Sequence, residues 1–196
     1  MIVYLHGFRS SPQSQKARQL KAHMEARGLG HLFCCDALPV RPAAAIALAE
    51  RQIAAARTPV TLVGSSLGGY YATYLAETHG LKAVLVNPAV VAHLSLADFV
   101  GPQTNLYTGE SFEFGPQHID ELRAIEVPVL TRPQDFLLLV ESGDEVLDHR
   151  QAVVRYAGAR QVVLPGGDHG FSRFADYLDA ILDFAGLRPA SAALPR

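Results

Sequence analysis

A serine-containing glycine motif lies between an apolar segment and a helical pattern near the middle of the chain. The motif is Gly64-Ser65-Ser66-Leu67-Gly68-Gly69, and the apolar segment before it is Val60-Thr61-Leu62-Val63. A serine at a sharp turn from a strand to a helix presents its hydroxyl above the end of the sheet, where it can attack a carbonyl. The chemistry that this motif indicates is acyl transfer.

The spacing of the glycines decides which of the two adjacent serines occupies the turn. The turn is so tight that the residues two before and two after the nucleophile must lack bulky side chains. Gly64 and Gly68 meet this need when Ser66 is central, whereas a turn centred on the preceding serine would place bulky residues there. Two other interpretations are a structural glycine-rich turn and an anion-binding loop. The second fits poorly, because the motif has neither a P-loop ending nor a dinucleotide-binding pattern.

Two backbone N–H groups are expected to stabilise the oxyanion of a tetrahedral intermediate. In such a turn one donor is the residue after the nucleophile, here Leu67. The second must come from a neighbouring strand end, and Tyr4-Leu5-His6-Gly7-Phe8 supplies one. We expect Gly7 to turn the chain so that the Phe8 N–H faces the pocket, and His6 to have a structural role.

His169 is the histidine best placed to act as a general base. It lies in Pro165-Gly166-Gly167-Asp168-His169-Gly170, after the last strand pattern and before the last helical pattern. This loop belongs to the same predicted sheet edge as Ser66. Histidine accepts and returns protons near neutral pH, so His169 is the candidate base. We interpret the remaining histidines as surface, packing or structural residues.

A carboxylate is needed to fix the tautomer of that histidine. The apolar strand pattern over residues 136–140 is followed by Gly-Asp, which puts Asp144 in a loop at the carboxyl end of the predicted sheet. Asp148 is the second choice, and Asp168 is expected to satisfy local backbone donors. The resulting order, serine then aspartate then histidine, is that of α/β-hydrolases and differs from the orders in the two main serine-protease folds.

The chain resembles the YqiA-like small bacterial esterases of the α/β-hydrolase superfamily from about Ile2 to Leu187. The motifs that carry the resemblance are Leu5-His6-Gly7-Phe8, Ser10-Ser11-Pro12, Gly64-Ser65-Ser66-Leu67-Gly68-Gly69, Gly143-Asp144-Glu145-Val146-Leu147-Asp148 and Gly167-Asp168-His169. The resemblance implies a trimmed fold, without the two strands that precede the first one in larger relatives. It also implies esterase or thioesterase activity on small acyl substrates, with Ser66, Asp144 and His169 as the triad.

Arg9 is a departure from this pattern, since a small polar residue is expected after Phe8. If Arg9 lines the pocket, it would attract an anionic acyl group or a coenzyme-A-like group. The alternative is a solvated loop arginine.

The positions of these residues depend on an alternation of short apolar runs with helical patterns. This alternation predicts an α/β fold, here a minimal α/β-hydrolase fold with about six mostly parallel strands and helices on both faces. The predicted strands are Ile2–Leu5, His31–Cys35, Val60–Val63, Ala83–Val86, Phe136–Val140 and Gln161–Leu164. Helices are expected after Pro12, from Pro42, after the serine motif, and over residues 174–185.

One stretch interrupts the alternation. Residues 88–127 carry three glycines and scattered aromatic residues but no clear strand. We expect them to form an irregular, lid-like excursion from a single domain that spans residues 1–187. Tyr107, Phe112 and Phe114 either line an acyl site or pack this loop. Residues 188–196, rich in alanine and proline, are expected to fray.

Composition limits the class of partner. The chain has 196 residues, 49% of them hydrophobic and 18% charged, with a net charge of −2 and no basic stripe, so nucleic acid is not an expected partner. No secretion signal or membrane-spanning run is apparent. The adjacent Cys34 and Cys35 predict buried, reduced thiols rather than a disulfide or a metal site. We therefore expect a cytoplasmic protein without membrane association.

The sequence as a whole predicts a serine hydrolase that needs no metal or cofactor and acts on a small-molecule ester or thioester. A peptidase or C–C hydrolase with the same triad is an alternative, and so is a non-catalytic binding module with the same fold. The natural substrate, the acyl chain length and the oligomeric state stay open.

Overall fold

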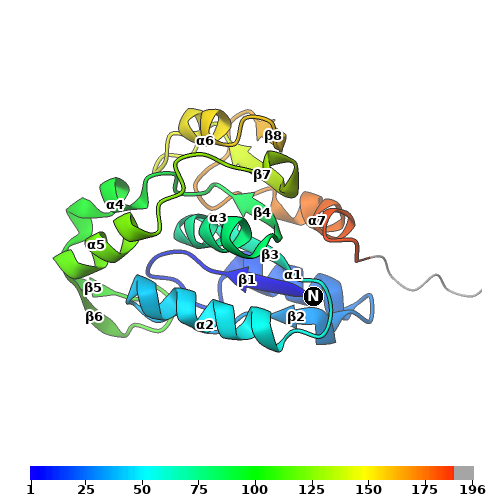
Figure 1. Ribbon diagram of the computed structural model, residues 1–196, viewed down its shortest axis with the longest axis horizontal. Helices are drawn as coiled ribbons and strands as arrows, with labels where there is room; N and C mark the ends of the chain where they lie inside the picture. Colours follow the sequence, from blue (N-terminus) through cyan, green and yellow to red (C-terminus); the bar gives the residue numbers. More distant parts are fainter. Residues whose placement is uncertain (188–196) are drawn as a thin grey trace, which may run out of the picture.

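The computed structural model describes residues 1–187, and residues 188–196, which were expected to fray, lie outside the described part. The centre of the fold is a six-stranded, all-parallel sheet with the strand order β2-β1-β3-β4-β7-β8 (Figure 1). The strands are β1 (Ile2–Leu5), β2 (Phe33–Cys34), β3 (Thr61–Ser65), β4 (Lys82–Val86), β7 (Phe136–Glu141) and β8 (Arg160–Leu164). The predicted α/β class is confirmed.

The four inner strands are buried almost throughout. β1, β3 and β7 are buried at every position, and β4 at every position except Lys82. Continuous apolar runs are required where helices cover both faces of a sheet, and this is why these strands could be predicted to within one or two residues. The edge strand β2 is shorter than predicted, because Gly30–Leu32 forms a 3-10 turn ahead of it.

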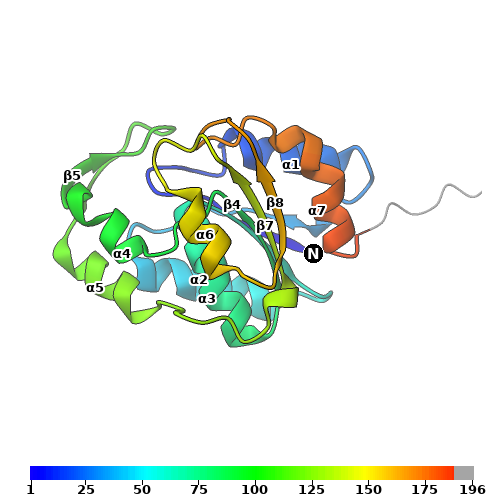
Figure 2. The same ribbon diagram turned by 90° about the horizontal axis from the view of Figure 1, so that it is seen from above.

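Helices cover both faces of the sheet (Figure 2). α1 (Gln15–Glu25) and α7 (Leu178–Phe184) pack on one face. The other face is covered by α2 (Pro42–Ala55), α3 (Leu67–His79) and α6 (His149–Arg155). Pro42 is the first residue of α2, where its missing N–H costs nothing. The predicted last helix divides into a 3-10 turn, Phe174–Tyr177, followed by α7.

The segment over residues 88–127, expected to be irregular, has secondary structure of its own. It contains α4 (Ala92–Ser95), a 3-10 turn (Ala97–Phe99), the antiparallel strands β5 (Gly101–Thr104) and β6 (Ser111–Phe114), and α5 (Pro116–Ala124). The two strands escaped prediction because each has only four residues, about half of them polar. In Figure 1 the segment lies at the end of the sheet toward which the β1 arrow points, which is the carboxyl edge.

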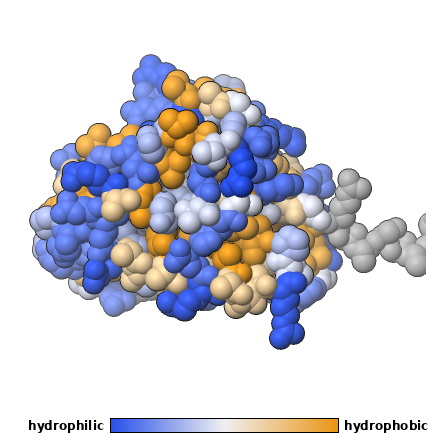
Figure 3. Space-filling view, viewed as in Figure 1, coloured by the Kyte–Doolittle hydropathy of each residue, from blue (hydrophilic) through white to orange (hydrophobic). Residues whose placement is uncertain are grey.

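The surface carries no continuous apolar belt on the face drawn in Figure 3, where hydrophobic side chains lie in separate patches among hydrophilic ones. Within residues 1–187 no helix is both long and apolar enough to cross a membrane. Cys34 and Cys35 are free thiols, as expected, but both are only half-buried, whereas the sequence predicted buried side chains. Burial, together with Cys34 and Asp36, raises the pKa of Cys35 to about 12, so its thiol is unreactive at neutral pH.

Candidate active site

Ser66 occupies the turn between β3 and α3. Its backbone has φ 55° and ψ −123°, a strained combination that non-glycine residues rarely adopt and that a nucleophile in a tight turn does adopt. Close packing explains the glycines on either side. A Cβ atom on Gly64 would collide with the carbonyl group of Gly68, and one on Gly68 would collide with the carbonyl group of Leu5. Both positions therefore exclude a side chain.

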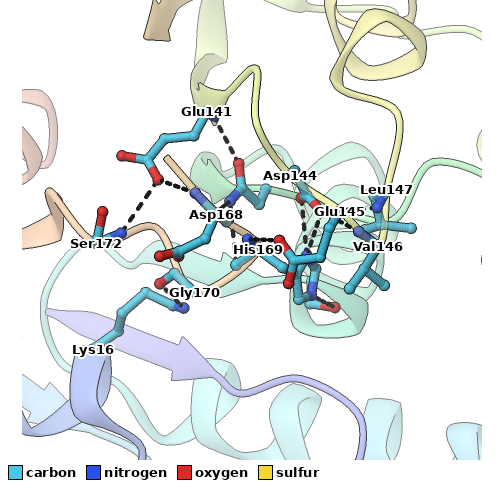
Figure 4. Close-up of polar contacts among 12 residues, drawn as sticks. Lys16, Glu141, Asp144, Glu145, Val146, Leu147, Asp168, His169, Gly170 and Ser172 are labelled. Atoms are coloured by element: carbon cyan, nitrogen blue, oxygen red, sulfur yellow. Dashed lines mark hydrogen bonds and ion pairs between the residues drawn. The ribbon is translucent and has the colours of Figure 1, made fainter. Parts of the chain in front are cut away.

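The side chains of Ser66, His169 and Asp144 form a continuous hydrogen-bonded chain. The Nε2 atom of His169 lies 3.1 Å from Ser66 Oγ. Its Nδ1 atom lies 3.0 Å and 2.9 Å from the two carboxylate oxygens of Asp144, as Figure 4 shows. The three residues follow β3, β8 and β7, so the parallel sheet brings them to one edge. The side chain of Asp144 is 2% exposed and that of His169 is 23% exposed.

Backbone donors help to hold the Asp144 carboxylate. The N–H groups of Val146 and Leu147 donate to Asp144 Oδ1 at 2.9 Å and 2.8 Å. Burial alone would raise the pKa of Asp144. The hydrogen bond from His169 and the two backbone donors outweigh that effect, and the pKa lies below its ordinary value.

The charge on Asp144 decides the tautomer of His169. An ionised carboxylate can only accept hydrogen bonds, so the His169 proton lies on Nδ1. The lone pair on Nε2 then faces the Ser66 hydroxyl, which is the arrangement that a general base requires.

Asp148, the second choice of acid, has other partners. Its carboxylate caps α6 by accepting from the Arg150 N–H at 3.0 Å, and it forms an ion pair with the Arg150 side chain at 2.7 Å. These contacts direct Asp148 toward the N-terminus of α6. Of the two carboxylates considered, Asp144 is the one that contacts His169.

The two backbone donors predicted for the oxyanion lie next to Ser66. Leu67 is the first residue of α3, so its N–H has no acceptor within the helix. On the β1 side, a Cβ atom on Gly7 would come within 3.2 Å of Ser66 Cβ, so this turn is in close contact with the nucleophile. The N–H of the next residue, Phe8, has no acceptor within residues 1–187. Both N–H groups are available to a substrate oxygen.

His6 holds the turn that carries Phe8. The Leu38 N–H donates to His6 Nε2 at 3.0 Å. Because a backbone N–H can only donate, the ring proton lies on Nδ1, which donates to the carbonyl oxygen of Gly7 at 3.1 Å. Burial lowers the pKa of His6, and the hydrogen bond to the Gly7 carbonyl only partly opposes this shift. The lowered pKa favours the neutral ring. His6 therefore links two loops and does not face the nucleophile.

A buried carboxylate that sequence reasoning did not single out fixes the His169 loop (Figure 4). Glu141, the last residue of β7, is fully buried. It accepts from the N–H groups of Asp168 at 2.9 Å and Ser172 at 3.3 Å. It also accepts from Arg173 Nε at 2.7 Å. The loop is thus held on both sides of His169 by one side chain.

Asn87, directly after β4, completes this attachment. Its Nδ2 atom donates to the carbonyl oxygens of Asp168 at 2.9 Å and His169 at 3.2 Å. Its Oδ1 atom accepts from the Glu141 N–H at 3.0 Å. Asn87 has φ 40°, a conformation that asparagine tolerates better than most residues. The sequence signal for both residues is a polar side chain at the end of a buried apolar strand.

We expect Glu141→Gln to reduce stability and to flatten its dependence on acid pH. Burial would raise the pKa of Glu141, but Arg173 and the Asp168 N–H outweigh it, and the pKa lies below its ordinary value. A depressed carboxylate pKa contributes stability above the unfolded value of about 4.3, and this contribution is lost as the pH falls through the folded value. We expect a loss of about 3 kcal/mol at pH 7 in urea unfolding. The account would be contradicted if the variant had the same unfolding free energy as the wild type and the same dependence of that free energy on pH between pH 7 and pH 4.

Two of the four residues considered for substrate binding line the cavity at the nucleophile. Arg9 and Tyr107 line a cavity of about 230 Å³ that also reaches Ser66 and His169. We call this the catalytic cavity. Phe112 lines a second cavity of about 160 Å³, which shares Phe8 and Arg9 with the first.

Phe114, the fourth of these residues, is 1% exposed and packs with its ring against that of Phe8, at a centroid distance of 4.9 Å. Its place is in the core beneath the turn that carries the Phe8 N–H.

The loop between β5 and β6 contributes Leu106 and Tyr107 to the wall of the catalytic cavity. The Leu106 N–H donates to the carbonyl oxygen of Arg9 at 2.8 Å, and Arg9 Nε donates to that of Thr104 at 2.9 Å. Asn105 Nδ2 donates to the carbonyl oxygen of Ser10 at 2.8 Å. These three bonds tie the excursion to the turn that follows β1.

A parallel sheet with a serine turn after β3, an aspartate loop after β7 and a histidine loop after β8 is the arrangement of the α/β-hydrolase fold. The sequence profile of an uncharacterised protein family, UPF0227, matches residues 1–186, and the chain belongs to that family. The predicted resemblance is confirmed at the level of the family.

Solved structures share the fold at low sequence identity. A putative hydrolase from Agrobacterium vitis S4 is 17% identical, with a TM-score of 0.75 over 93% of this chain and 87% of that one. A monoacylglycerol lipase from Paleococcus ferrophilus is 16% identical, with a TM-score of 0.70 over 95% and 94%. The esterase domain of a Rhodothermus marinus protein is 19% identical, with a TM-score of 0.67 over 94% and 85%. At these identities the likeness shows the fold.

Proposed function

We propose that the protein is a serine hydrolase that cleaves small carboxylic esters or thioesters through an acyl-enzyme on Ser66. The observation that carries the proposal is the hydrogen-bonded chain from Ser66 Oγ through His169 to a buried Asp144. A serine hydroxyl is a weak nucleophile without a base, and His169, held by Asp144, is a base in the required tautomer.

The reaction begins when Ser66 Oγ attacks the substrate carbonyl and His169 Nε2 takes the hydroxyl proton. The N–H groups of Phe8 and Leu67 hold the resulting oxyanion. When the tetrahedral intermediate collapses, His169 returns the proton to the departing alcohol or thiol, which leaves an ester on Ser66. Water then attacks this ester with His169 as base, and as the bond to Ser66 Oγ breaks, His169 returns the proton to Oγ and the acid product leaves.

Two further observations support the proposal, the first on the size of the substrate and the second on the ester bond. The catalytic cavity, at about 230 Å³, is smaller than the roughly 300–1,000 Å³ typical of pockets for drug-sized ligands. Proteins of the same fold include one named as a monoacylglycerol lipase and one named as an esterase domain. The fold itself does not choose between esters, thioesters and amides.

A substrate panel tests the proposed reaction. We expect the protein to hydrolyse p-nitrophenyl acetate and butyrate at least tenfold faster, in kcat/KM, than the decanoate ester, because the cavity admits short acyl groups. Matched acyl thioesters are expected to react, and p-nitroanilides to react far more slowly. Amide hydrolysis as fast as ester hydrolysis would instead indicate a peptidase. If the folded protein turned over no member of the panel, the proposed function would be wrong.

A further inference from the structure

We propose that the catalytic cavity binds substrates that carry an anionic oxygen group, a carboxylate or a phosphate, close to the scissile ester, with Lys16 as its cationic partner. The inference rests on the proposed function, because this cavity is the one that Ser66 and His169 reach.

The charges that line the cavity are all of one sign. Lys16 and Arg9 both line it, whereas no aspartate or glutamate does within the described residues. Neither cation belongs to an ion pair within 4.0 Å among residues 1–187. The whole chain has a net charge of −2, so this local positive charge does not follow from its composition. A cleft lined by one sign of charge attracts ligands of the other sign.

Lys16 is held at the cavity by the loop that carries the base. Its Nζ atom donates to the carbonyl oxygen of Gly170 at 2.6 Å, next to His169, as Figure 4 shows. An ammonium group has three donors, so two are left for a ligand. Burial lowers the pKa of Lys16, and Asp168 opposes that shift. An anion beside the ammonium would offset the cost of its burial.

Two more carboxylates, Asp144 and Glu141, act on Lys16 more weakly than Asp168 does. Both have nearer partners, since Asp144 contacts His169 and Glu141 contacts Arg173. Asp168, which is exposed, has the largest effect of the three carboxylates on Lys16.

The start of α1 contributes to the same site. Ser14, Gln15 and Lys16 line the cavity at the N-terminus of this eleven-residue helix. The first N–H groups of a helix lack intrahelical acceptors, and the helix dipole favours negative charge there. The Ser14 side chain makes no capping hydrogen bond.

An independent observation points to a missing polar partner. The hydroxyls of Ser14 and Tyr4, from residues that are 7% and 1% exposed and line the cavity, form no hydrogen bond of good geometry within residues 1–187, although they lie close to one another and the Tyr4 phenol lies close to Ser65. Burial raises the pKa of Tyr4, so its phenol stays protonated and can donate. Buried hydroxyls are rarely left unpaired in folded proteins, so these two leave unused hydrogen-bonding capacity at this end of the cavity.

Two matched pairs of esters test the proposal and locate the charge. Monoethyl glutarate and diethyl glutarate differ by a carboxylate on the acyl part. The compounds 4-acetoxybenzoate and methyl 4-acetoxybenzoate differ by a carboxylate on the alcohol part. We expect kcat/KM to be about tenfold higher for the anionic member of one pair, as a charge-assisted hydrogen bond would provide. The pair that shows the preference identifies the side of the ester that enters the cavity.

Variants separate charge recognition from support of the His169 loop. Lys16→Met should remove the preference, measured within each variant as the ratio of kcat/KM for the anionic ester to kcat/KM for the neutral ester, whereas Lys16→Arg should keep it. Ser14→Ala should lower the preference by a smaller factor without loss of folding. Lys21→Met is the charge-matched control, because Lys21 lies on the exposed part of the same helix, where it pairs with Glu25. This variant should leave the preference for the anionic ester unchanged. Equal losses for both members of each pair in Lys16→Met would mean that Lys16 only supports the loop, and would overturn the proposal.

The outcomes distinguish this inference from the function on which it rests. If the wild type hydrolyses the neutral esters but shows no preference in either pair, the anion site is refuted and the hydrolase stands. If no ester is hydrolysed, the proposed function fails, and calorimetric titration with glutarate decides the anion site. Binding to the wild type that is lost in Lys16→Met supports the site, and absence of binding to the wild type refutes it.

Discussion

Replacement of Ser66 by alanine is expected to abolish ester hydrolysis, with kcat lowered by about 10⁶-fold. The variant keeps His169 and Asp144 but has no atom that can attack the carbonyl. The fold should be retained, because Ser66 Oγ contacts His169 Nε2 at 3.1 Å and holds no other element in place. Steady-state rates with p-nitrophenyl acetate, together with thermal unfolding, measure both parts of this expectation.

The result would count against the account if Ser66→Ala kept a tenth or more of the wild-type rate. That outcome would point to another nucleophile or to water activated directly by His169. Loss of activity with a large fall in the unfolding temperature would show a structural role for the hydroxyl instead.

The second large effect is expected for Asp144→Asn, with kcat lowered by about 10⁴-fold, as in other triads of this kind. The asparagine oxygen can still accept from the Val146 and Leu147 N–H groups, so the loop keeps its shape. Its NH₂ group then faces His169 Nδ1 and donates to it. The ring proton moves to Nε2, and the base can no longer accept from Ser66.

Asp148→Asn is the matched control for that substitution. It changes a neighbouring carboxylate that caps α6 and pairs with Arg150. We expect kcat within about twofold of the wild type, although some stability is lost with the cap. Equal losses of activity in the two variants would contradict the assignment of Asp144 as the acid.

The inner strands and the residues at their ends could be predicted because burial leaves a clear trace in the sequence. β1, β3, β4 and β7 are apolar runs, and parallel strands bring their carboxyl ends to one edge. Ser66 and Asp144 follow β3 and β7, and His169 follows the less buried edge strand β8 after a pair of glycines, and the structure brings the three together.

Other parts of the site depend on tertiary contacts that local patterns do not encode. Glu141 looks like the last residue of a strand, and only the folded chain shows that the His169 loop wraps around it. Lys16 looks like one basic residue among several on a helix. It faces the cavity because α1 packs against the sheet with its N-terminus beside the loop at Gly170. The β5–β6 pair was missed because its strands are short and about half of their residues are polar.

The most direct test of Ser66 as nucleophile is reaction with a fluorophosphonate, followed by intact mass measurement and peptide mapping. A fluorophosphonate phosphonylates a serine that a neighbouring base has activated. We expect one adduct per chain, located on Ser66 and not on Ser65, and no adduct in Ser66→Ala. A folded wild-type protein that stays unlabelled, or a Ser66→Ala protein that is labelled at the same rate, would contradict the account.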